Sequence, residues 1–67
     1  MSAFVCTKDG RNIGSAYKIV GGFAWSVVLD GATVRLGRHH NENVAQHNMM
    51  TAAREMGVEA VLEVLEY

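Results

Sequence analysis

Two Asp-Gly pairs constrain the fold of this chain more than any other feature of its sequence. Asp9-Gly10 and Asp30-Gly31 each separate runs that are rich in β-branched and aromatic residues. A type I′ turn needs a positive φ at both central residues, and Asp-Gly tolerates this, so each pair predicts a two-residue hairpin loop. Gly21-Gly22 is a third turn signal. The spacing predicts an antiparallel β-meander with strands at residues 3–8, 12–20, 23–29 and 32–37.

The hairpin loops also predict which side chains share a face. A two-residue loop at Asp30-Gly31 pairs Leu29 with Ala32 and alternates the faces from there. This register gathers one apolar set on the core face: Phe23, Trp25, Val27, Leu29, Ala32, Val34 and Leu36. It leaves a second set on the opposite face, Ala24, Ser26, Thr33 and Arg35, with Val28 as the apolar exception there.

The first two strands follow the same logic. Pairing Lys8 with Arg11 places a further set on the core face: Phe4, Cys6, Ile13, Ser15, Tyr17 and Ile19. At the middle turn, a three-residue loop that starts at Val20 pairs Ile19 with Phe23 and is favoured, because it keeps this set together and leaves Lys18 outward. A two-residue loop at Gly21-Gly22 is the alternative. Gly14 inside the second strand indicates a bulge or a close backbone approach.

A helix is predicted after Arg38, where the apolar period changes. Asn41 or Asn43 can cap its N-terminus, and Gly57 is a C-terminal stop. One side of the helix is apolar, with Ala45, Met49, Ala52, Ala53 and Met56, and the other carries Asn43, His47 and Arg54. Residues 58–67 fit a second short helix better than a fifth strand, which stays open as the alternative. The predicted fold is a single α+β domain, a four-stranded antiparallel meander packed against a C-terminal helix.

Length and cysteine content limit the class of protein. A chain of 67 residues forms one domain, with a net stability of about 3–5 kcal/mol unless a staple or an oligomer adds to it. Cys6 is the only cysteine, which excludes an intramolecular disulfide and favours a reducing, cytoplasmic compartment. We expect no signal peptide and no membrane contact, since no apolar run approaches the roughly 20 residues that cross a bilayer.

Charge is unevenly distributed along the chain. Residues 1–40 hold five Lys and Arg against two Asp, a net charge of +3. Residues 41–67 hold one Arg against five Glu, a net charge of −4. Such a split indicates either two different interaction faces or the ordinary solvation of a sheet and a helix.

Residues that carry chemistry are few. His39, His40 and His47 suggest a metal site, but zinc needs three or four converging ligands, and exposed histidines in a polar connection explain the cluster more simply. A nucleophilic Cys6 would need a lowered pKa, and its predicted mid-strand position on the core face favours a buried thiol. Neither a phosphate-binding loop nor a catalytic pair of carboxylates is recognisable, so we expect no enzyme activity, cofactor or metal.

The leading hypothesis is a small non-enzymatic protein-binding module, an inhibitor or modulator of a larger complex of the kind that phages encode, with a tendency to form homo-oligomers. A sheet face that binds nucleic acid is the first alternative, because the predicted register turns Lys18 and Arg35 outward. A histidine metal site is the second alternative. The candidate interaction surface comprises eight residues: Lys18, Arg35, Arg38, His39, His40, His47, Met50 and Arg54.

Overall fold

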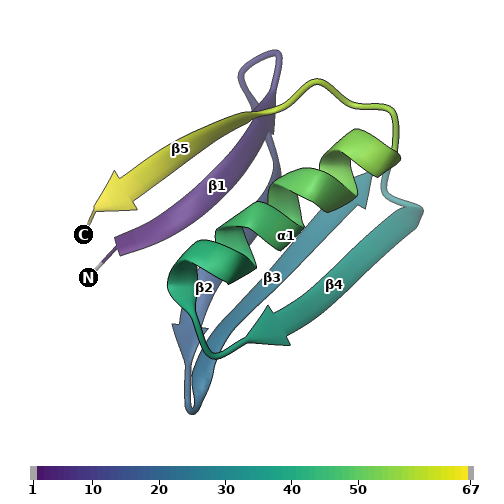
Figure 1. The fold of residues 1–67 in the computed structure, drawn as a ribbon. Coiled ribbons are helices and arrows are strands. Elements are labelled where there is room, and N and C mark those ends of the chain that lie inside the picture. Colours follow the sequence, from purple (N-terminus) through teal and green to yellow (C-terminus); the bar gives the residue numbers. More distant parts are fainter. Residues whose placement is uncertain (1, 67) are drawn as a thin grey trace.

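The chain folds into one antiparallel sheet with a helix across one face. The computed structural model describes residues 2–66, with side-chain positions for 7–32 and 34–64. Its elements are β1 Ser2–Lys8, β2 Arg11–Ile19, β3 Gly22–Leu29, β4 Thr33–His39, α1 Glu42–Glu55 and β5 Val61–Glu66. The strands lie in the order β4-β3-β2-β1-β5, and α1 covers β2, β3 and β4 more than β1 (Figure 1). The predicted α+β class, with a meander packed against a helix, is confirmed.

Residues 61–66 form a strand, so the preferred helical interpretation of the C-terminal segment is wrong and the alternative of a fifth strand is right. β5 pairs with β1 from Ser2 opposite Glu66 to Thr7 opposite Val61. Local periodicity favoured a helix, but β1 offers a complete row of unpaired backbone groups, and pairing with it satisfies both strands. Tertiary pairing therefore overrides the local pattern.

The core lies between α1 and the sheet. Its fully buried cluster is Ala16, Val27, Met49, Ala52 and Ala53. The predicted apolar stripe of α1 is confirmed, because its alanines and Met49 are buried while Asn43, His47 and Arg54 are exposed. Small side chains on this stripe allow the helix to approach the strands closely. Met49 and Val27 are the largest side chains that are completely enclosed.

Asn41, one of the two predicted N-cap residues, caps the start of the helix. The Asn41 side-chain oxygen accepts the backbone N–H groups of Asn43 and Val44 at 2.9 and 3.2 Å. These donors have no partner inside the helix, so the cap satisfies groups that would otherwise rely on water.

Removing this cap gives a first testable prediction. Asn41→Ala should lower the free energy of unfolding by about 1 kcal/mol, because two helical N–H groups lose their acceptor. Urea denaturation followed by far-UV circular dichroism measures the change. Asn43→Ala is the matched control, since Asn43 is exposed in the first turn of the helix and contributes its backbone N–H, not its side chain, to the cap. Equal losses in the two variants would contradict the capping role of Asn41.

The helix ends at Glu55, just before Gly57, as the sequence predicted. Gly57 has φ +82°, and its N–H donates to the Arg54 carbonyl at 2.9 Å. The next N–H, from Val58, reaches back to the Ala53 carbonyl at 3.1 Å. This pair of bonds is the Schellman motif, which turns the chain out of the helix and buries Val58 against it.

The three hairpins differ in how well the sequence predicts them. The first has Lys8 opposite Arg11 around Asp9-Gly10, as predicted, and a bulge lies next to Gly14. The second pairs Ile19 with Gly22 around a Val20-Gly21 loop, so both considered pairings of the middle turn are wrong. Gly21 has φ +88° and carries the turn one residue earlier than expected.

The third hairpin contains the correction with the largest effect. Asp30 and Gly31 adopt positive φ values of 54° and 69°, and the Ala32 N–H donates to the Leu29 carbonyl at 3.2 Å, so the turn forms as predicted. However, Leu29 pairs with Thr33, because Ala32 remains in the loop as one additional residue. The whole of β4 is therefore shifted by one position relative to the predicted register.

A shift of one residue exchanges the two faces of a strand. Val28, and not Val27, lies opposite Val34, so Val34 and Leu36 project from the face opposite Val27 and Trp25. Their predicted place in the core is wrong. The side chains of Phe4, Cys6 and Thr33, which the predicted register also assigned to faces, lie outside those that the structure describes.

The predicted core assignment also fails on β2. Trp25 lies opposite Ala16, which is 1% exposed, while Tyr17 is 46% exposed on the other face. The pairing Ile19–Gly22, in place of Ile19–Phe23, produces this exchange.

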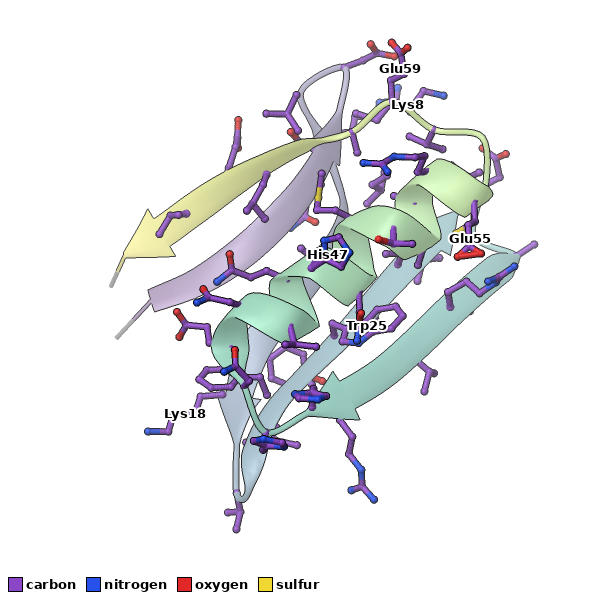
Figure 2. All side chains as sticks on the ribbon, viewed as in Figure 1. Lys8, Lys18, Trp25, His47, Glu55 and Glu59 are labelled. Carbon is purple, nitrogen blue, oxygen red and sulfur yellow. The ribbon has the colours of Figure 1, made fainter. Side chains whose placement is uncertain are left out.

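Trp25 packs beside α1 on the helix side of the sheet (Figure 2). Its cross-strand neighbour is Gly37, and a Cβ at that position would lie 2.8 Å from Cζ2 of the indole. Glycine therefore leaves the space that the ring occupies. The indole N–H is buried and has no hydrogen-bond partner among the described residues.

Candidate functional site

The face of the sheet opposite α1, which we call the open face, is apolar. Its large exposed side chains include Tyr17, Val28, Val34 and Leu36, with exposed fractions of 46, 40, 50 and 73%. Val28 and Val34 are direct cross-strand partners, and Leu36 follows on the same side of β4. An antiparallel sheet with one solvated face normally carries polar side chains there. A contiguous apolar area of this kind is typical of an interaction site.

The middle of the open face has few protruding side chains, because the residues there are small. Ser15 lies opposite Ser26, and Tyr17 lies opposite Ala24, so small residues separate the larger ones. Another surface can therefore approach the backbone of the central strands closely.

Two opposite charges stand at the two edges of the open face. Leu36, Ser26 and Ser15 form one cross-strand row, which continues through β1 to Glu63 on β5. Arg38 lies two residues beyond Leu36 along β4, at the other edge. Of the strand side chains that are described, these two are the charged ones on this face. The open face is therefore almost neutral, with one cation at the β4 edge and one anion at the β5 edge.

The structure does not gather the eight predicted interaction residues on one surface. Lys18 lies opposite Phe23, and Arg35 lies opposite Val27, so both belong to the helix side of the sheet. Their predicted place on the open face is wrong, and the one-residue register shifts are the cause. Arg54 is exposed in the last turn of α1, and Met50 is half-buried at the margin of the core.

Arg38, His39 and His40 are brought together. They line a hollow of ≈ 400 Å³ at the end of the sheet, beside the turn between β2 and β3. The two imidazole rings stack with their centroids 4.4 Å apart, and His39 Nδ1 accepts the Asn41 N–H at 3.0 Å. This bond ties His39 to the start of α1.

His47 lies apart from that pair, on the outer side of α1 (Figure 2), where its Nε2 is 3.5 Å from the Thr51 hydroxyl. Within the described part of the chain, no three His, Cys, Asp or Glu side chains are placed to share a metal ion. The predicted histidine cluster is therefore divided between the sheet end and the helix. The thiol of Cys6 lies outside the described side chains.

The signal that would have identified the open face is Gly37. A glycine inside a strand indicates that another group approaches the backbone closely. Aligning Gly37 with Trp25, the one tryptophan of the chain, sets the register in which Val34 and Leu36 face outward. The strong Asp30-Gly31 signal hid this because it predicts the turn and not the residue that follows it.

Comparison with known proteins returned no matching family model, curated protein or solved structure. Across residues 2–66, the helical segment is too short and too polar to cross a membrane.

Proposed function

We propose that the chain is a small non-enzymatic protein-binding module and that the open face is its contact surface. The observation that carries the proposal is the exposed apolar area around Leu36, on the side of the sheet that α1 leaves uncovered. Covering this area removes apolar surface from water at about 25 cal/mol per Å², which is the dominant favourable term in protein association.

The chemistry of the open face favours a protein over a nucleic acid. A nucleic acid is held mainly by cations that neutralise phosphates, and single strands also need a row of aromatic rings. Arg38 is the one Lys or Arg among the described side chains of this face, and Tyr17 is its one aromatic ring. Lys18 and Arg35, on which the nucleic-acid alternative depended, lie on the helix side.

In this proposal the chain acts by occupying a surface of another protein, and the role of inhibitor or modulator of a larger complex follows from that occupancy. A domain of 67 residues with an exposed apolar sheet face is suited to this role, because that face can cover part of the surface of a larger protein.

A matched pair of variants tests the contact surface. Leu36→Glu places a charge at the most exposed apolar side chain that β4 contributes to the open face, while Val20→Glu adds the same charge at a fully exposed turn. We expect the apolar dye ANS to bind the wild type and Val20→Glu whenever the face is free, and to bind Leu36→Glu several-fold more weakly. Proteins from a host lysate that bind the wild type and Val20→Glu should be lost with Leu36→Glu. Equal capture and equal dye binding by all three would contradict the proposal.

A further inference from the structure

Given the proposed function, we infer that the protein that covers the open face is a second copy of this chain. The two copies pack face to face, with the sheets in contact and the helices on the outside. A domain of this size has little core of its own, and burying the open face against a copy enlarges it.

The area of the open face is suited to a stable dimer. Strands spaced about 4.8 Å apart and about 25 Å long give a five-stranded face with a projected area of roughly 600 Å². The accessible surface of this face is larger, because the side chains project from it. A standard stable interface buries about 800 Å² per partner. Most of the face must therefore be covered, which a second sheet of the same dimensions achieves.

The charges select how the copies are related. A twofold axis parallel to the strands places β4 over β5 of the partner, with Leu36 over the row of the partner's Glu63 and Arg38 two residues, about 7 Å, further along the strand. The long side chain of Arg38 reaches back along the strand towards the partner's Glu63, and the reverse pair forms at the other edge. A twofold axis perpendicular to the strands instead places β5 over β5 and brings Glu63 close to its own copy. The first arrangement pairs opposite charges and the second opposes like charges, so the first is favoured.

The middle of the face fits the same arrangement. Sheets pack about 10 Å apart, and small residues such as Ser15, Ala24 and Ser26 allow that approach. β2 is the central strand of the five, so an axis parallel to the strands passes near it. Tyr17 therefore lies near the axis and packs against its own copy, as an aromatic anchor of the kind that dominates interface energies.

Reversing the charges tests this dimer. In sedimentation equilibrium we expect the wild type to have twice the 7.3 kDa mass of the monomer. Arg38→Glu should raise the dimer dissociation constant about tenfold or more, because it opposes two carboxylates at each edge. The double variant Arg38→Glu/Glu63→Arg should restore most of the affinity. Arg35→Glu is the control, since Arg35 is exposed on the same strand but on the helix side, and it should leave the dissociation constant unchanged.

The outcomes separate this inference from the proposed function. A wild type that stays monomeric at millimolar concentration overturns the homodimer. If another protein is still captured in a Leu36-dependent manner, the open face remains a protein-contact surface and only its occupant was misassigned. If neither occurs, both proposals fail. A dimer that the double variant does not restore, or that Arg35→Glu weakens as much as Arg38→Glu, overturns the face-to-face arrangement. Far-UV circular dichroism verifies that each variant is folded.

Discussion

Met49→Ala is expected to remove most of the stability of this chain. Met49 is one of the two largest fully enclosed side chains, and it belongs to the only fully buried cluster among the described residues. Truncating a buried methionine costs about 2–5 kcal/mol, as lost transfer energy plus a residual cavity. A domain of this size has a net stability of about 3–5 kcal/mol. The variant should therefore be substantially unfolded at room temperature, whereas substitutions on the surface should change little.

Urea denaturation at one fixed protein concentration measures this effect, because association also contributes to apparent stability. Met50→Ala is the matched control: it removes the same atoms from the next residue, which is half-buried at the edge of the core. Its loss should be clearly smaller. If the two variants unfold at the same denaturant concentration, the core is not centred on Met49 as the structure shows.

The second large effect is expected from Gly37→Ala. The added methyl group would lie 2.8 Å from Cζ2 and 2.9 Å from Cε2 of Trp25, which is closer than such carbons approach in proteins. Either the indole or β4 must move, and overpacking of this kind typically costs about 1–3 kcal/mol. Because Trp25 is the only tryptophan, its fluorescence spectrum should shift as the ring is displaced towards water. An unchanged spectrum with unchanged stability would show that the ring does not lie over Gly37.

A double-mutant cycle identifies the clash as the cause. Trp25→Phe removes the ring atoms that crowd position 37, together with the buried N–H that has no described partner. In a Trp25→Phe background, Gly37→Ala should therefore destabilise the chain less than it does in the wild type, with a coupling of about 0.5–3 kcal/mol. Purely additive losses would indicate that the two positions are independent.

The local turns and the helix caps could be predicted from the sequence. Asp9-Gly10, Asn41 and Gly57 each require a backbone conformation or a hydrogen bond that neighbouring residues alone determine. The apolar stripe of α1 was readable for the same reason, since its period is internal to one segment. The strand β5 was not, because β1, more than fifty residues away, decides its conformation.

The faces of the strands were predicted less well, because one additional loop residue exchanges the two faces of the strand that follows it. The loop residue Ala32 carries no unusual signal, yet its presence moves Val34 and Leu36 from the expected core to the surface, and Arg35 from the open face to the helix side. A further shift at Val20-Gly21 exchanges Ala16 and Tyr17. Tyr17, Val34 and Leu36 of the candidate site therefore belong to the set that the predicted register had placed inside, and they could not be recognised before the pairings were known.

The pairing of β1 with β5 has a consequence for how the chain folds. The other three pairings are hairpins between consecutive strands, whereas Thr7 and Val61, which are hydrogen-bonded here, stand 54 positions apart. Closing a loop of that length costs about 2–3 kcal/mol more chain entropy than closing a hairpin. We therefore expect the meander and α1 to assemble first, with β5 docking late, and amide hydrogens of β5 to exchange with solvent faster than those of β2 and β3.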